Sequence, residues 1–194
     1  MTATDQRVRC AWIDESRLSP DDFVLYRDYH DNEWGRPLRD SKALFERVTL
    51  EAFQSGLSWL IILRKRENFR RAFHGFDVER VARYRERDIA RLMDDTGIVR
   101  NRAKIEATIA NARAVAELDV DLAELLWSFA PPPRPRPAAM ADVPAVTPES
   151  TAMAKELKRR GFRFVGPTTA YALMQATGMV DDHTADCWVP ATIR

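Results

Sequence analysis

Apolar side chains recur at helical spacing along most of the chain, and helix start and stop signals interrupt this pattern. The segment Ser19-Pro20-Asp21-Asp22 combines a capping serine, a first-turn proline and two acids, so a helix is expected from there to about Asn32. Similar signals predict helices over 41–54, 58–73, 77–84, 87–95, 101–118, 121–129, 147–161 and 167–178. No segment alternates convincingly with a period of two, and the fold is therefore expected to be all-α.

The second predicted helix carries an acid at a position where its pattern asks for an apolar residue. Four residues line one face at spacings of four, three and four: Leu44, Val48, Glu51 and Ser55. Since the two apolar residues should turn this face inward, Glu51 should be at least partly buried, with a shifted pKa. Gly56 stops this helix, so a turn there can bring Glu51 and Trp59 into one pocket. The alternative is a glutamate that only ties two helices together.

The composition is that of a globular protein with one core, or with two small lobes that share a cleft. The chain has 194 residues, of which 45% are hydrophobic and 30% charged. A net charge of +1 excludes a uniformly basic surface but allows local basic patches. No apolar run reaches the roughly 18 residues of a membrane span, and the first residues, MTATDQRVRC, lack the apolar core of a signal peptide. A cytoplasmic location without membrane association is expected.

The two cysteines and two of the three histidines form a possible metal site: Cys10, His30, His183 and Cys187. The last two are separated by three residues, a spacing at which two ligands share one side of a turn. Two thiolates and two imidazoles make a closed, structural zinc site, and it would link the two ends of the chain. The alternative is a pair of small buried cysteines with a capping histidine, since a disulfide is disfavoured in the cytosol.

The predicted helices on either side of residues 96–100 have the outline of a helix–hairpin–helix. A turn at Gly97 aims backbone N–H groups at a phosphate near the start of the second helix. Three basic residues lie beside it, Arg100, Arg102 and Lys104. The alternative is a plain connection, because many helical hairpins contain glycine and arginine.

Five aromatic residues bracket Glu51 in the sequence: Trp12, Tyr26, Tyr29, Trp34 and Trp59. Most such residues belong to a core. However, a carboxylate among stacked rings is also what the recognition of an extruded nucleobase requires.

Five motifs follow one another over nearly the whole chain: YHDNEWG (29–35), LE with GLSW (50–51, 56–59), KREN (65–68), GIVRNRAKI (97–105) and RGFRFVG (160–166). Together they closely resemble the 3-methyladenine DNA glycosylase I family. The resemblance implies a helix–hairpin–helix glycosylase fold and excision of 3-methyladenine from alkylated double-stranded DNA. It also implies a structural Zn²⁺ that joins the termini. We expect a monomer of one glycosylase unit, 1–194, in which about 1–40 and 140–194 form a zinc-bound lobe against a central lobe of about 41–130.

The resemblance also assigns roles by position. It implies that Cys10, His30, His183 and Cys187 are the zinc ligands. It implies that Glu51 and Tyr29 hydrogen-bond the base, that Trp59 stacks on it, and that Leu57 lies near the gap left by the base. The other pocket residues would be Trp12, Tyr26 and Trp34.

The chain departs from the wider pattern in three ways. Ala52-Phe53 stands where smaller or more polar residues are common, and the hairpin has no second glycine. The superfamily's catalytic aspartate is missing at its usual distance, since Asp119 and Asp121 fall in a helix junction. Two alternatives therefore stay open: a zinc-bearing DNA-binding module whose pocket Phe53 occludes, and a zinc hydrolase, which would need an open metal position.

The chemistry of the implied substrate explains how so few residues would suffice. A 3-methylated adenine in DNA is cationic and leaves as a neutral base, so the enzyme need not protonate it. It must extrude the nucleotide and stabilise positive charge on the sugar while water attacks. We expect Glu51 to act in recognition and electrostatics and not as a nucleophile. No lysine near the motifs is an obvious Schiff-base former, so base excision without strand cleavage is expected.

Overall fold

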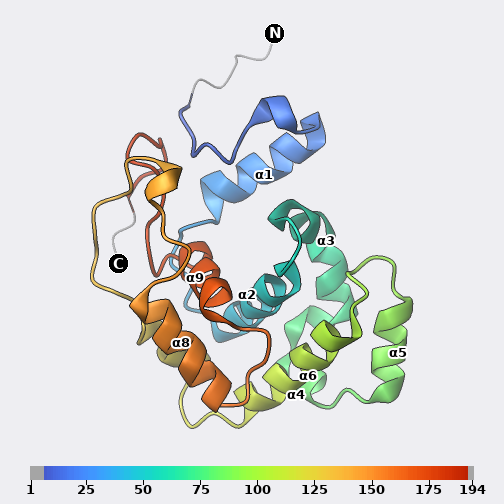
Figure 1. Cartoon of the computed structure of the whole chain (residues 1–194). Helices are drawn as coiled ribbons and strands as arrows, with labels where there is room; N and C mark the ends of the chain where they lie inside the picture. Colours follow the sequence, from blue (N-terminus) through green and yellow to red (C-terminus); the bar gives the residue numbers. More distant parts are fainter. Residues whose placement is uncertain (1–6, 192–194) are drawn as a thin grey trace.

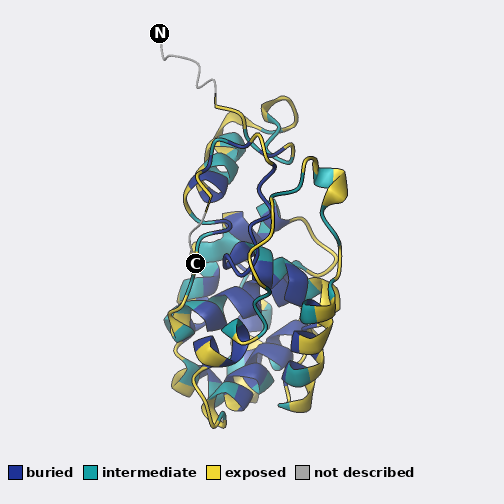
Figure 2. Ribbon diagram, turned by 90° about the vertical axis from the view of Figure 1, so that its left-hand side faces the viewer, coloured by how far each residue is buried: buried dark blue, intermediate teal, exposed yellow. Residues whose placement is uncertain are grey.

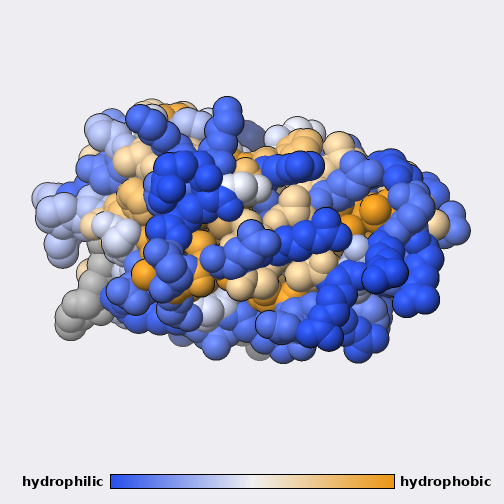
Figure 3. All heavy atoms as spheres, turned by 90° about the horizontal axis from the view of Figure 1, so that it is seen from below, coloured by the Kyte–Doolittle hydropathy of each residue, from blue (hydrophilic) through white to orange (hydrophobic). Residues whose placement is uncertain are grey.

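The chain folds as a bundle of α-helices joined by short 3-10 helices and loops (Figure 1). The computed structural model describes residues 7–191, and within this range there is no β-strand, which confirms the all-α prediction. The expectation about a signal peptide rests partly on residues 1–6, which lie outside the described residues. None of the helices within 7–191 combines the length and apolar character needed to cross a membrane. The face shown in Figure 3 is largely hydrophilic, with smaller apolar areas between the polar side chains.

The predicted helices are present in the predicted order, with ends that differ by a few residues. The described part contains α1 (Pro20–Asn32), α2 (Ser41–Gln54), α3 (Trp59–Ala72), α4 (Val78–Ala82), α5 (Glu86–Asp94), α6 (Arg102–Ala116), α7 (Leu122–Trp127), α8 (Pro148–Arg159) and α9 (Pro167–Ala176). The 3-10 helices are η1 (Glu15–Arg17), η2 (His74–Phe76) and η3 (Met140–Asp142).

The helix starts follow from local hydrogen bonds that the sequence encodes. Ser19 accepts a hydrogen bond from the Asp22 amide, and Asp40 accepts one from the Ala43 amide at 2.8 Å. Ser58 is different: it has the extended backbone of an N-cap, but its side chain makes no capping hydrogen bond.

Helix α2 lies among the other helices in Figure 1 and packs against α3, α6, α7 and α9. Figure 2 shows that buried residues are concentrated inside this bundle. Its apolar side chains, among them Leu44, Val48 and Phe53, are buried. The Phe53 ring packs against Phe69, with ring centroids 4.8 Å apart, and against Phe73 at 6.2 Å. Phe53 therefore belongs to the core, where it fills space between α2 and α3 and does not occlude a pocket.

The two ends of the described chain meet beside α1. The Trp188 amide donates to the Val8 carbonyl at 2.9 Å, and the Trp188 indole N–H donates to Asp31 at 3.2 Å. Arg9 forms a buried ion pair with the same carboxylate at 2.8 Å. Helices α8 and α9 pack against each other, and α9 also packs against α2. These contacts join the termini, while the division into two lobes stays a prediction.

Candidate active site and metal cluster

Glu51 lies in the last turn of α2, and its side chain is directed inward as predicted, with 5% of its surface exposed. Within residues 7–191, no hydrogen-bond donor reaches its carboxylate. Burial raises its pKa to about 7, and the charge of Arg47 offsets only part of this rise. A buried carboxylate without a hydrogen-bond partner raises the free energy of the folded protein. It is therefore suited to a ligand that supplies the missing positive charge or hydrogen-bond donors.

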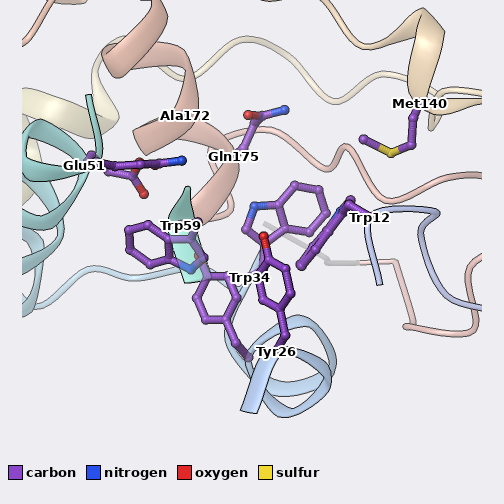
Figure 4. A pocket seen from close by; sticks show the side chains of 10 residues that line it. Trp12, Tyr26, Trp34, Glu51, Trp59, Met140, Ala172 and Gln175 are labelled. Atoms are coloured by element: carbon purple, nitrogen blue, oxygen red, sulfur yellow. The ribbon is translucent and has the colours of Figure 1, made fainter. Parts of the chain in front are cut away.

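A cavity opens in front of this carboxylate (Figure 4). It encloses about 550 Å³, including its open mouth, which is within the usual size range of small-molecule sites. All five predicted aromatic residues line it, and so do Glu51 and four further residues: Gln54, Met140, Ala172 and Gln175. Figure 4 shows Glu51 at the left of this space, Gln175 above it and Met140 at the right, with the aromatic rings below them.

The aromatic rings form a connected wall. Trp12 is at the centre, with its ring centroid 4.9 Å from that of Tyr26 and 5.3 Å from that of Trp34. Tyr29 and Trp59 form a second pair at 5.3 Å. The buried indole N–H of Trp59 has no hydrogen-bond partner among the described residues. The flat apolar faces of these rings are therefore available to a planar ligand.

Arg47 supports this wall from within the core, although sequence reasoning did not identify it. Its guanidinium donates to the Tyr29 hydroxyl at 3.0 Å and lies over the Tyr29 and Trp59 rings, 5.3 and 5.2 Å from their centroids. It also contacts Glu33 at 3.5 Å. Burial raises the pKa of Tyr29, whose hydroxyl therefore stays protonated. The sequence feature that could have identified Arg47 is its position one turn before Glu51, on the same helical face.

Two of the additional lining residues, Met140 and Gln175, were not among the predicted site residues. Met140 belongs to η3, in the segment between α7 and α8. Gln175 lies on α9, and its amide donates to Asp182 at 3.0 Å. Tertiary packing alone brings both to the cavity.

A second cleft adjoins the first and shares Glu51, Gln54 and Ala172 with it. It encloses about 560 Å³, including open solvent. One wall is the turn after α2, with the exposed Leu57 at its edge, and the opposite wall is the first turn of α9. Leu57 thus lies beside the site, as the resemblance implies, and its role in DNA binding stays a prediction.

The predicted zinc ligands come together at the junction of the termini. The ligand atoms of Cys10, His30 and Cys187 lie within 4.8 Å of one another, and all three residues are buried. Both cysteines are free thiols. The His30 Nδ1–H donates to Asp31 at 2.7 Å, which leaves its Nε2 atom, 3.6 Å from the Cys187 sulfur, available as a ligand.

His183, the fourth predicted ligand, lies beside these three residues but is not among those whose ligand atoms lie within 4.8 Å of one another. Its Nδ1–H donates to Asp181 at 3.0 Å, and its ring centroid lies 5.1 Å from that of His30. Its Nε2 atom is buried and has no hydrogen-bond partner among the described residues. Two imidazoles oriented by carboxylates, with two adjacent thiols, fit a closed tetrahedral zinc site.

The turn between α5 and α6 is held by the KREN motif of α3. Lys65 donates to the Thr96 carbonyl at 2.9 Å and to the Gly97 carbonyl at 3.3 Å, and Asn68 donates to the Gly97 carbonyl at 3.1 Å. The Gly97 N–H donates to Asp95 at 2.8 Å, so this amide is engaged within the chain. A Cβ at Gly97 would meet the Asp95 carboxylate at 2.9 Å, which explains the glycine.

The three basic residues beside this turn are placed differently. Arg100 is exposed, and Arg102 pairs with Glu86 and Glu106 at 2.7 Å. Lys104 is only 7% exposed, and its ammonium donates to the Phe53 carbonyl at 2.9 Å and to the Ser55 carbonyl at 2.6 Å. The prediction that Lys104 contacts phosphate does not fit this geometry, because the ammonium binds the end of α2.

Residues 20–190 match the family model described as methyladenine glycosylase. The chain belongs to the methyladenine glycosylase family. It is 45% identical over 184 residues to DNA-3-methyladenine glycosylase 1 of Escherichia coli (strain K12), covering 92% of this chain and 95% of the relative. It is 43% identical over 187 residues to DNA-3-methyladenine glycosylase of Haemophilus influenzae (strain ATCC 51907 / DSM 11121 / KW20 / Rd), covering 92% and 96%.

Solved structures agree with this assignment. A crystal structure of 3-methyladenine DNA glycosylase I is 46% identical to the chain, with a TM-score of 0.87 and coverage of 93% of this chain and 98% of the other. A structure of the Staphylococcus aureus enzyme, which concerns its 3-methyladenine recognition, is 36% identical, with the same TM-score of 0.87 and coverage of 96% and 98%. The family predicted from the sequence motifs is confirmed, and with it the prediction that the chain is a glycosylase.

Proposed function

We propose that this methyladenine glycosylase acts in base-excision repair by hydrolysing the N-glycosidic bond of 3-methyladenine in alkylated double-stranded DNA. The observation that carries the proposal is the buried Glu51 carboxylate, which has no hydrogen-bond partner within residues 7–191 and faces a cavity walled by five aromatic residues. The relatives described above bear the name of this activity, and one solved relative concerns recognition of this base.

The charge of the substrate explains why a carboxylate is suited to this cavity. A 3-methylated adenine in DNA carries a positive charge that normal adenine lacks. An ionised Glu51 attracts this charge, whereas a neutral adenine would leave the carboxylate without compensation in a buried place. Selectivity thus comes from charge as well as from the shape of the aromatic wall.

The raised pKa of Glu51 couples ionisation to binding. Because burial raises this pKa to about 7, a large share of the free protein carries a protonated Glu51 at neutral pH. A cationic base in the cavity lowers the pKa again and holds the carboxylate ionised. The same negative charge stabilises the positive charge that develops on the sugar as the base leaves. Glu51 acts in this way through its field, and water is the nucleophile.

Extrusion of the nucleotide needs a group that fills the space left in the duplex. Leu57 is 37% exposed and follows Gly56, whose φ of +80° permits the sharp turn after α2. We propose that Leu57 enters the gap while the extruded base stacks on Trp59 and contacts Tyr29. Arg100 and the hairpin at Gly97 would hold the adjacent backbone, as the resemblance implies.

Base removal should leave the strand intact. A lyase step needs a lysine amine at the sugar, and among the described residues no lysine lines either cleft. The two lysines of the KREN and GIVRNRAKI motifs, Lys65 and Lys104, donate to backbone carbonyls instead.

We propose that Cys10, His30, His183 and Cys187 hold a structural Zn²⁺. Bound there, zinc would supply a four-ligand cross-link between the termini and no open position for catalysis, which argues against a zinc hydrolase. Asp31 and Asp181 would orient the two imidazoles through their Nδ1–H groups.

The test is chromatographic identification of the bases that the protein releases from methylated duplex DNA, with strand integrity measured on the same samples. We expect free 3-methyladenine, and strand breaks only after alkali or heat. If duplex DNA is bound but no base is released, the protein is a DNA-binding module and the proposed activity is wrong. Strand breaks without alkali or heat would contradict hydrolysis without a lyase step.

A further inference from the structure

We propose that the second cleft binds the sugar and one phosphate of the extruded nucleotide. The first turn of α9 would bind the phosphate. This inference rests on the proposed function, because it assumes that the base occupies the first cavity. It assigns a DNA-contacting role to Thr168 and Thr169, which no motif assigned.

The two clefts form one continuous path. Glu51, Gln54 and Ala172 line both, so a ligand that fills the first cavity continues directly into the second. One face of α9 follows this path: Thr168 lies at the second cleft, Ala172 at the junction and Gln175 at the base cavity. These residues are spaced by four and three positions, as one helical face requires. A nucleotide whose base lies beside Gln175 therefore brings its backbone towards the start of α9.

The start of α9 presents free donors to this cleft. Its N-cap is Gly166, which has no side chain to cap the helix, and its first residue is Pro167, which has no N–H. The N–H and hydroxyl groups of Thr168 and Thr169 have no acceptor within residues 7–191, and the first turn contains no acid. In contrast, a serine, threonine, aspartate or asparagine side chain caps each of α1, α2, α4, α6, α7 and α8. Free N–H groups at a helix start are a favourable place for a phosphate.

Glu51 is the second, independent indication that a ligand occupies this path. Its carboxylate is buried, has no hydrogen-bond donor in the described part of the chain, and lines both clefts at their junction. The atom of a nucleotide at this junction is the sugar carbon that bears the base. A carboxylate there suits the positive charge that develops on that carbon, while the phosphate lies farther along the cleft at the positive end of α9.

The loop that leads into α9 is fixed in place, which preorganises the proposed phosphate site. The buried Asn111 of α6 accepts from the Arg163 amide at 2.7 Å and donates to the Arg163 carbonyl at 3.1 Å. Phe162 and Val165 anchor the same loop in the core. This gives the RGFRFVG motif a purpose: it sets the position and direction of the α9 start.

The experiment compares Thr168→Asp with the neutral, nearly isosteric Thr168→Asn. Binding to a duplex with a tetrahydrofuran abasic-site analogue is measured over a range of salt concentrations, and binding of free 3-methyladenine is followed by tryptophan fluorescence. We expect Thr168→Asp to weaken duplex binding by roughly tenfold or more and to reduce the salt slope by about one phosphate contact. Thr168→Asn should stay close to wild type, and free base binding should not change.

Two controls make the result specific. Thr151→Asp places the same charge on an exposed position of α8, and we expect little effect there. Thr169→Glu tests the same phosphate at the next position, where an acid favours the helix start and the fold should be retained. The proposed phosphate site would be wrong if both Thr168→Asp and Thr169→Glu kept the salt slope of the wild type. It would also be wrong if Thr151→Asp lost as much duplex affinity as Thr168→Asp. Failure of the wild type to release 3-methyladenine would instead overturn the proposed function.

Discussion

The Trp34 indole and the His183 imidazole pack edge to face, with ring centroids 4.7 Å apart. On its other side, Trp34 meets Trp12 at 5.3 Å, and Trp12 itself lies 5.1 Å from the ring of His30. The aromatic wall of the base cavity therefore rests directly on two of the proposed zinc ligands. Loss of the metal should disturb the cavity as well as the junction of the termini.

Replacing a proposed zinc ligand tests this connection. Cys187→Ser should lower the bound metal, lower the melting temperature by roughly 10 °C, and weaken binding of free 3-methyladenine because Trp34 loses its support. Metal analysis, thermal melting and tryptophan fluorescence measure the three effects. Val189→Ala is the control, since it removes buried volume nearby but no ligand. Full metal content and an unchanged melting temperature in Cys187→Ser would contradict the zinc cross-link.

Glu51→Gln tests the charge recognition. The variant keeps the size of the side chain but loses its negative charge, so release of 3-methyladenine should fall by about 10- to 100-fold. Affinity for undamaged duplex DNA should change little. Glu46→Gln on the same helix, where the carboxylate pairs with Arg70 at 2.8 Å, should keep its activity. Unchanged release by Glu51→Gln would remove this residue from the site.

The same variant should change how stability depends on pH. Burial raises the pKa of Glu51 from 4.5 to about 7, so the folded state binds a proton more tightly than the unfolded state. The stability from this proton is complete below pH 4.5 and is lost as the pH rises through 7. Glu51→Gln has no such loss. The difference in free energy of unfolding, variant minus wild type, should therefore increase by about 3 kcal/mol from pH 4 to pH 8. Urea unfolding of both proteins across this range measures the difference, and parallel curves would contradict a raised pKa.

The basic residues beside the hairpin should separate into two classes. Arg100→Ala should weaken duplex binding and lower the salt slope by about one contact, because its exposed charge is available to phosphate. Lys104→Met should lower the melting temperature and leave the salt slope unchanged, because its ammonium binds the Phe53 and Ser55 carbonyls. A reduced salt slope in Lys104→Met would restore the prediction of a phosphate contact.

Gly178 provides a stability test away from the chemistry. Its φ is +71°, and a Cβ there would lie 2.7 Å from backbone atoms of Arg36 and Pro37. Gly56 has a similar φ of +80°, but a Cβ there would meet nothing within 4 Å. Gly178→Ala should therefore cost roughly 3 kcal/mol or more, against about 1 kcal/mol for Gly56→Ala. Equal melting temperatures for the two variants would show that the backbone crossing at Gly178 is not tight.

The sequence predicted those features that depend on near neighbours. Helix starts at Ser19 and Asp40 depend on hydrogen bonds within three residues, so local motifs reveal them. The inward direction of Glu51 followed from helical periodicity alone. Periodicity also held a signal for Lys104, since positions 104, 108 and 111 share the buried face of α6. The neighbouring arginines favoured a phosphate contact for Lys104 instead. The lysine is buried in the structure because its apolar stem can pack in the core while its ammonium reaches a carbonyl.

Other features could not be predicted because they arise only from packing. Met140 and Gln175 reach the cavity through loops and helix contacts that no local pattern encodes. The second cleft likewise exists only where the turn after α2 faces the start of α9. The family motifs indicated that the RGFRFVG segment matters but not what it holds in place.

The meeting of the two ends also orders events during translation. Trp12 and Glu51 leave the ribosome well before His183, which contacts Trp34. A nascent or prematurely terminated chain that lacks residues beyond 180 therefore carries the acid without the completed wall around it. If the proposed function holds, chains that lack this segment should compete poorly for damaged sites with chains that contain it.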